Sequence, residues 1–356
     1  MPYPPCTVTN NWLKYQDPAR CLRRVTQPPH IAGPLPNIRY KIRHMRKEFI
    51  TIATLFIAIN AGFSQKELNN KSAFSNLIGT YFGQKPPESY PVLFAPEIMN
   101  AEQGYHFPII FSPDLTEAFW KPMEIGNTGL LYSQMIDEKW TTPLRINFSF
   151  EKGIGDACFS PDGNKLFFLS FQGQHAGDIE RERIWFVERN SSGWSKPTLI
   201  DEVINSHPTH WKFSLATNGN LYFTSEIKGV QGEQDIYVAY FVDGKYHSPI
   251  SVGHAINTDA KEFGAFIAPD ESYLIFTRIG DKTEKTDLFI SFKNQDGNWT
   301  KAINMGPKIN SPSHDMIATV SYDGKYLFFI SQRERMNGIY WVNTKIIDEL
   351  KPQEIR

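Results

Sequence analysis

The 356-residue sequence has little cysteine and almost no net charge. Its three cysteines, Cys6, Cys21 and Cys158, are spaced for neither a disulfide framework nor a zinc site, and we expect Cys158 to be a small core residue. The 37 basic and 38 acidic residues balance, so no global field attracts nucleic acid or an anionic membrane surface. We therefore expect no nucleic-acid partner, no resident metal and no other cofactor.

Motifs of several enzyme classes are also missing. The sequence has no Gly-x-Ser-x-Gly nucleophile elbow, no Walker loop and no nucleotide-binding glycine fingerprint. A serine peptidase is therefore not expected. The stretch Asn294–Trp299 resembles the Asp-box turn of sialidases, but it lacks the serine and the threonine of that motif, and we interpret it as an ordinary hairpin turn.

Long apolar runs are rare, and the one near the N-terminus is short. Arg46 and Lys47 precede the apolar run 49–59, and Gly62-Phe63-Ser64 then offers the small residues of a cleavage site. This pattern predicts a secretory signal peptide over residues 45–64, and hence a periplasmic or secreted protein with no stable membrane insertion after cleavage. Because an export signal should begin a chain, we expect Met45 to be the start and residues 1–44 to be translated upstream sequence or a disordered leader.

One turn pattern recurs five times between Phe111 and Phe329. The starts of the five copies lie 48, 54, 54 and 53 residues apart, a period close to that of solenoids and propellers. Asp-Gly and Asn-Gly pairs supply the positive φ angles of tight hairpins, so each copy should join two antiparallel strands. The copies are Phe111–Asp114, Phe159–Gly163, Phe213–Gly219, Ile267–Asp270 and Val320–Gly324.

Each copy continues with an aromatic strand, a further strand, and an aromatic residue three positions before a proline or its counterpart. The proline lacks a ladder donor, so the strand beside it should form the exposed outer edge of a four-stranded sheet. The last copy lacks this outer strand, whereas Pro91–Phe94 near the N-terminus resembles it. We therefore predict an all-β propeller of five four-stranded antiparallel blades, with the N-terminal strand completing the last blade.

The turns and strands resemble a known repeat. Phe159–Gly163, the strand Asp235–Val238, and Gly297–Lys301 leading to Ile309–Ser311 resemble the WD-like β-propeller repeats of the TolB-like group. The resemblance covers roughly residues 86–350. It implies a propeller fold more than a function, because such repeats occur in binding proteins and as regulatory caps on hydrolases. Propellers of this group commonly have six blades, so six is the alternative to the five counted here.

The resulting domain organisation is simple. Residues 65–85 are predicted to be a linker or N-terminal arm, residues 86–350 a single propeller, and residues 351–356 a tail. We expect a monomer.

Polar residues recur where the innermost strands should begin. Asn205, Asn257 and Asn310 each precede another polar residue by five positions, which predicts a ring around one mouth of the central channel. His106 stands seven residues before Pro113, as Glu262 stands seven before Pro269 and Asp315 seven before Tyr322. The second copy departs from this offset, since it has Ile154 there and Asp156 two residues later. The ring residues, our candidates for ligand binding, are His106, Asp156, His210, Glu262 and Asp315.

Three interpretations of this ring remain open. Its side chains either satisfy backbone groups at strand ends, bind a ligand such as a sugar or a stabilising metal ion, or supply acid and base groups from among Glu262, Asp315 and Asp156. The pair His207 and His210 lacks the helical geometry of a persuasive metal site. One aromatic residue precedes each outer strand. We expect these residues to pack one sheet against the next, and the alternative is that they stack on sugar rings; they are Trp140, Trp194, Tyr246 and Trp299.

The function favoured by these patterns is a non-enzymatic binding module. It would take a protein, peptide or glycan at the mouth of the channel. The alternative is a glycan-active enzyme, a glycoside hydrolase or lyase, that uses carboxylates of the ring. Whether the chain catalyses any reaction is left open by the sequence, with the absence of enzyme motifs favouring binding.

Overall fold

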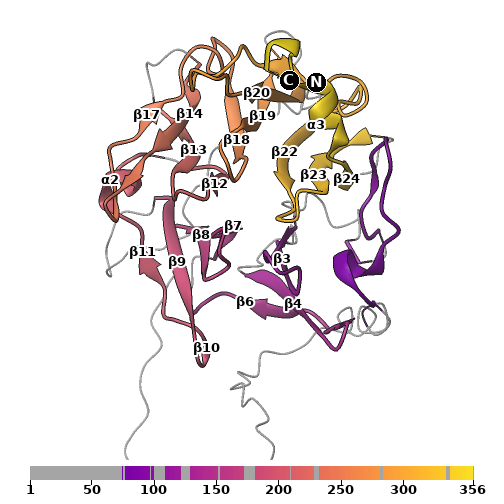
Figure 1. The fold of residues 1–356 in the computed structure, drawn as a ribbon. Coiled ribbons are helices and arrows are strands. Elements are labelled where there is room, and N and C mark those ends of the chain that lie inside the picture. Colours follow the sequence, from indigo (N-terminus) through magenta and orange to yellow (C-terminus); the bar gives the residue numbers. More distant parts are fainter. Residues whose placement is uncertain are drawn as a thin grey trace, which may run out of the picture. The chain divides into compact units, whose positions relative to one another are not determined.

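Five antiparallel sheets follow one another along the chain, each built from one copy of the repeat. The computed structural model describes Phe74 and residues 77–96, 98–99, 109–121, 129–150, 153–171, 181–208, 210–227, 232–280, 284–333 and 337–355. The predicted signal peptide, the residues before it and His106 lie outside these ranges. Figure 1 shows the sheets arranged around a common centre in the order of the sequence, so the predicted five-bladed propeller is confirmed.

The first three strands of each blade pair with their neighbours in sequence, from the centre outward. In blade 1 they are β2 (Ile110–Phe111), β3 (Glu117–Trp120) and β4 (Leu130–Ile136); in blade 2, β7 (Gly155–Phe159), β8 (Lys165–Ser170) and β9 (Arg183–Asn190); in blade 3, β12 (Phe213–Leu215), β13 (Leu221–Glu226) and β14 (Gln234–Ala239); in blade 4, β18 (Glu262–Ile267), β19 (Tyr273–Ile279) and β20 (Thr286–Phe292); and in blade 5, β22 (Asp315–Val320), β23 (Tyr326–Ser331) and β24 (Gly338–Asn343).

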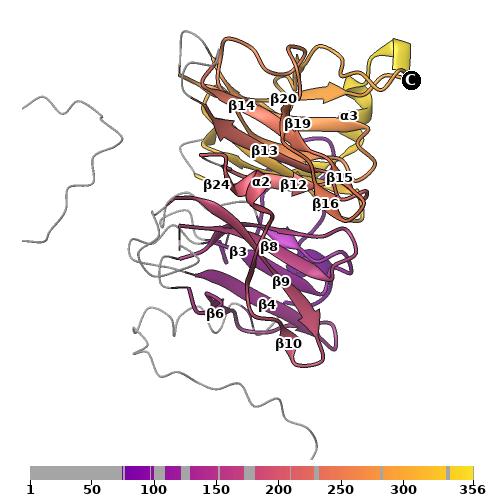
Figure 2. The same cartoon turned by 90° about the vertical axis from the view of Figure 1, so that its left-hand side faces the viewer.

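A short outer strand completes each of the first four blades. It begins directly after Pro143, Pro197, Pro249 or Ala302, as the spacing predicts. The aromatic residue before it belongs to a small hairpin that extends the third strand, and Figure 2 shows β10 and the β15–β16 hairpin at one side of the molecule. The outer strands are β6 (Leu144–Ile146), β11 (Thr198–Leu199), β17 (Ile250–Ser251) and β21 (Ile303–Asn304), and the hairpin strands are β5 (Lys139–Trp140), β10 (Gly193–Trp194), β15 (Phe241–Val242) and β16 (Lys245–Tyr246).

The N-terminal strand closes the ring. Strand β1 (Val92–Leu93) pairs antiparallel with β24, with Val92 opposite Trp341 and Leu93 opposite Tyr340. In Figure 1 the indigo N-terminal segment lies beside the yellow strands of blade 5. The predicted closure is therefore confirmed, and it gives the last blade an outer strand that would otherwise leave β24 as an open edge.

Apolar side chains fill the space between every two adjacent blades. One buried cluster lies at each of the five junctions, because the central strands carry apolar residues on both faces. The junction of blades 5 and 1 includes part of the predicted arm: Tyr81 and Phe82, in the 3-10 helix η1 (Thr80–Gly83), are almost completely buried there. The arm thus takes part in the core.

Helices are few and short among the described residues. Helix α2 (Glu202–Asn205) connects blades 2 and 3, and α3 (Lys345–Leu350) packs Ile346 and Ile347 into the junction of blades 4 and 5. A further 3-10 helix, η4 (Gln353–Ile355), follows α3. In the described part of the chain, no helix is long and apolar enough to cross a membrane.

Candidate functional site: a charged mouth above a closed channel

Four inner strands carry a residue with left-handed backbone at the same place. The φ angles are 42° at Asp156, 48° at Lys212, 72° at Gly264 and 49° at Ile317. Each of these residues stands four positions before the residue whose carbonyl closes the hairpin turn, namely Ser160, Ala216, Ala268 and Ser321. The residues of blades 2, 4 and 5 lie at a register shift with the second strand, whereas Lys212 directly precedes β12. Such bulges re-aim side chains, and left-handed backbone at a residue other than glycine costs roughly 1–3 kcal/mol. The four residues with left-handed backbone therefore lie at equivalent positions along the channel wall.

The residues with left-handed backbone in blades 2 and 3, Asp156 and Lys212, carry opposite charges and lie near each other. Asp156 and Lys212 line the same small cavity, of about 10 Å³, together with Lys121 at the end of β3. Burial raises the pKa of Asp156, while the charges of Lys212 and Lys121 oppose this shift. The Oδ1 atom of Asp156 is buried and has no hydrogen-bond partner. A buried carboxylate oxygen without a partner is costly, so its presence needs an explanation.

Glu182 adds a second carboxylate beside this pair. It directly precedes β9, and its Oε2 atom accepts hydrogen bonds from the backbone N–H groups of His210 (2.5 Å) and Trp211 (3.1 Å). Burial raises the pKa of Glu182 to about 7, with a smaller contribution from the charge of Asp156. The ring of Trp211 stays 42% exposed and lies edge-on to Phe263, with 6.1 Å between ring centroids.

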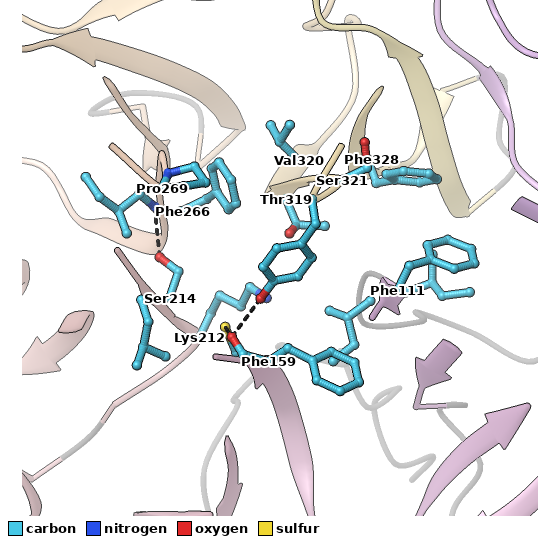
Figure 3. Close-up of a pocket in the computed structure, with 16 residues that line it drawn as sticks. Phe111, Phe159, Lys212, Ser214, Phe266, Pro269, Thr319, Val320, Ser321 and Phe328 are labelled. Atoms are coloured by element: carbon cyan, nitrogen blue, oxygen red, sulfur yellow. Dashed lines mark hydrogen bonds between the residues drawn. The ribbon is translucent and has the colours of Figure 1, made fainter. Parts of the chain in front are cut away.

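Below this level the channel is apolar and nearly closed. A cavity of about 40 Å³ there has room for only a few water molecules. Figure 3 shows Phe111, Phe159, Phe266 and Phe328 around it, with Lys212 reaching toward its centre. The hydroxyl of Tyr322, from the turn of blade 5, donates a hydrogen bond to the carbonyl of Phe159 in blade 2 (2.6 Å). A ligand much larger than water therefore does not fit this cavity.

Glu262 and Asp315, two of the predicted ring residues, are fully buried and make equivalent contacts. The Glu262 carboxylate accepts hydrogen bonds from the backbone and hydroxyl of Thr258 and from Arg278 Nε (2.7 Å). The Asp315 carboxylate accepts hydrogen bonds from the backbone and hydroxyl of Ser311 and from Arg333 Nη2 (3.0 Å).

Each arginine also donates to the carbonyl that precedes the repeated asparagine, at Ile256 and Ile309. These contacts hold the connection from one blade to the start of the next. They agree with the interpretation in which the ring side chains satisfy backbone groups at strand ends.

His210 takes the corresponding place at the start of blade 3, without an arginine. Its Nε2 atom lies 3.0 Å from the carbonyl of Ile204, the counterpart of the carbonyls of Ile256 and Ile309. Burial lowers the pKa of His210 to about 4, so at neutral pH its ring is uncharged. Asp156, by contrast, lies two residues further along its strand, at the bulge, and is therefore not at the level of Glu262 and Asp315.

The repeated asparagines explain the spacing that led to the ring. The side-chain amides of Asn205, Asn257 and Asn310 bond to both the N–H and the C=O of a third-strand residue in their own blade, at Ile184, Ile236 and Leu288. Each asparagine thus binds the connection between blades to the blade it leaves. The regular pattern in the sequence reflects this anchoring.

The other histidines and aromatics also have structural contacts. His207 Nδ1 lies 3.2 Å from Ser225 Oγ, and His314 Nδ1 lies 3.2 Å from Thr286 Oγ1. The described residues contain no group of three or more His, Cys, Asp and Glu side chains placed to hold a metal ion. The aromatics before the outer strands pack at junctions between blades or against a cation; these are Trp140, Trp194, Tyr246 and Trp299.

Of the charged residues in this cluster, the sequence pattern predicts only Asp156 as a site residue. Lys121, Glu182, Trp211 and Lys212 belong to no repeated motif. One signal was present: Lys212 stands four residues before Ala216, the residue whose carbonyl closes the turn of blade 3, as Asp156 stands four before Ser160 in blade 2. Only their shared left-handed backbone shows that these two positions are equivalent.

Comparison with known proteins shows similarity of fold only. No protein-family model and no curated protein sequence matches the chain. Among solved structures, a candidate TolB from Agrobacterium tumefaciens aligns at 16% identity over 64% of this chain and 69% of its own, with a TM-score of 0.45. TolB from Acinetobacter baumannii aligns at 15% identity over 67% of this chain and 52% of its own, with a TM-score of 0.38.

An endo-arabinase from Bacteroides thetaiotaomicron aligns at 12% identity over 68% of this chain and 95% of its own, with a TM-score of 0.46. TolB structures are thus among the solved propellers to which this chain is similar in fold. The five blades of this chain establish the propeller fold without help from the comparisons.

Proposed function

We propose that the chain is an exported binding module whose ligand sits at the channel mouth, over Lys121, Asp156, Glu182 and Lys212. The observation that carries this proposal is the buried Oδ1 atom of Asp156, which has no partner although two lysines and a cavity adjoin it. Folding alone would favour an apolar residue or a completed hydrogen bond at this place. An acceptor held ready for a ligand accounts for its retention.

The enzyme alternative finds less support. An acid and base pair must reach a substrate, but the carboxylates of Glu262 and Asp315 are fully buried and each accepts hydrogen bonds from a backbone amide and an arginine. Their geometry supports a role in holding the blades. The mouth cluster supports binding without implying a reaction.

Binding at the mouth is tested by screening the purified chain against peptide and glycan arrays. Asp156→Ala should weaken binding of the ligand found by about tenfold or more, since a hydrogen bond to a charged group contributes about 1.5–3 kcal/mol. Asp296→Ala, in the exposed hairpin turn of blade 4, is the matched control and should leave binding unchanged. Equal binding by both variants would place the ligand elsewhere.

Export is the second part of the proposal and rests on the sequence pattern of residues 45–64. N-terminal sequencing of the precursor and of the exported protein tests it. We expect the precursor to begin at Met45 and the mature protein at Gln65. Recovery of the protein only inside the cell, with peptides from residues 1–40 attached, would contradict the prediction.

A further inference from the structure

Asp156 and Lys212 face a common cavity with opposite charges and yet do not pair. Both line the cavity of about 10 Å³, and the charge of Lys212 acts on the Asp156 carboxyl. No ion pair joins the two side chains, although the backbone N–H of Lys212 also lowers the pKa of the Asp156 carboxyl, and Asp156 Oδ1 lacks a hydrogen-bond partner. Lys212 is only 5% exposed, so bulk water does not replace the missing contact. The two groups are therefore placed for something that lies between them.

The chemistry of that bridging group is restricted. It must donate a hydrogen bond to a carboxylate and accept one from an ammonium. A hydroxyl does both through one oxygen atom. A single water molecule, for which the cavity has room, does the same in the absence of a ligand. An anionic ligand group would face the carboxylates of Asp156 and Glu182, and a cationic one would face Lys121 and Lys212.

An exposed aromatic ring lies beside this charged pair. The backbone N–H of Trp211 is fixed by Glu182, and the ring, 42% exposed, is supported edge-on by Phe263. Trp211 directly precedes Lys212, and Glu182, which holds the Trp211 backbone N–H, lies close enough to Asp156 for the charge of Asp156 to raise its pKa. A flat apolar surface next to hydroxyl-binding groups suits a ligand with both C–H faces and hydroxyls.

We propose that the ligand is a neutral carbohydrate, bound through a hydroxyl that bridges Asp156 and Lys212 while its ring stacks on Trp211. This inference rests on the proposed binding site at the mouth and names its ligand class. The sugar remains outside the channel, because the space below the mouth holds only a few water molecules. Glu182, whose Oε2 atom already holds two backbone amides, positions Trp211 for the stacking contact.

The test measures binding of the purified chain to neutral, acidic and amino-sugar oligosaccharides and to a peptide library. The three variants are Asp156→Ala, Lys212→Met and Trp211→Ala, with Trp211→Phe as the conservative control. We expect a neutral oligosaccharide to bind and each of the three variants to weaken it by about tenfold or more. Trp211→Phe should retain most of the affinity, because it keeps an aromatic face.

The outcomes separate this inference from the proposed function. Peptides or charged sugars that bind and are lost with the Asp156 and Lys212 variants would keep the mouth site and overturn the neutral carbohydrate. Neutral oligosaccharides that bind equally to all variants would overturn the site itself. Absence of any neutral oligosaccharide binding overturns the inference as well. Thermal melting checks folding, and should Asp156→Ala not fold, Lys212→Met and Trp211→Ala decide the question.

Discussion

Replacing Arg278 with methionine should destabilise the propeller by about 3–5 kcal/mol, the usual cost of removing one partner of a buried ion pair. The Glu262 carboxylate, which is fully buried, would lose the hydrogen bond from Arg278 Nε, and the carbonyl of Ile256 would lose its donor as well. Methionine keeps much of the packing of the arginine stem. The loss would therefore measure the uncompensated charge and carbonyl.

Urea unfolding of Arg278→Met and of two control variants, each compared with the unaltered chain, measures this effect. The double variant Glu262→Gln with Arg278→Met should recover most of the lost free energy, because no buried charge remains. Lys308→Met removes an exposed ion pair with Glu349 and should change the free energy of unfolding by less than about 1 kcal/mol. An Arg278→Met variant as stable as Lys308→Met would show that Glu262 does not depend on the pair, and would reopen its candidacy as a functional carboxylate.

The blades were predictable because the residues that fix each hairpin turn lie next to one another in the sequence. The Ser160-Pro161-Asp162-Gly163 turn contains its own capping hydrogen bond, from Ser160 Oγ to Asp162 Oδ1 (2.5 Å), and its glycine at a φ of 71°. Each aromatic strand follows directly. The closure by Val92 was predictable for a related reason, since the last repeat lacked one strand and the N-terminal segment supplied a matching one.

The mouth cluster was not predictable in the same way. Asp156 and Lys212 are equivalent because both have left-handed backbone four positions before the turn of their blade, and neither this backbone conformation nor the bulge at Asp156 has a sequence signature of its own. The repeated asparagines gave a strong periodic signal, but it marks the anchors between blades. A search for periodic polar residues therefore finds the structural contacts first and passes over charges that occur in only one or two blades.

The N-terminal arm shows a second limit of the repeat. Residues 65–85 match no blade and were predicted to be a linker or N-terminal arm, without a role in the core. Tyr81 nevertheless contacts the junction of blades 5 and 1 through its ring and its hydroxyl, which donates to Asp323 (2.7 Å). Tyr81 and Phe82 both adopt left-handed backbone, with φ of 54° and 58°. Such a conformation comes from tertiary packing, so local sequence does not indicate it.

Replacing Phe82 with alanine should destabilise the propeller by about 3–5 kcal/mol, the range for removing a buried aromatic ring from a core. The Phe82 side chain is 1% exposed and packs edge-on against Trp140, with 4.7 Å between ring centroids, and against further rings of the same junction. Because this junction joins the last blade to the first, the cavity would weaken the contact that completes the ring. Chemical unfolding measures the loss.

Phe241→Ala serves as the matched control, since that ring lies in the exposed hairpin of blade 3 and is 38% accessible. Its loss of unfolding free energy should be well below that of Phe82→Ala.

A chain that begins at residue 86 extends the test, because it keeps β1 and all five blades but lacks the arm. We expect it to be at least as destabilised as Phe82→Ala. If both proteins unfold like the unaltered chain, β1 alone closes the propeller and the arm is only a covering segment; if both are weakened, the folding unit begins before the first repeat, at the arm that packs between blades 5 and 1.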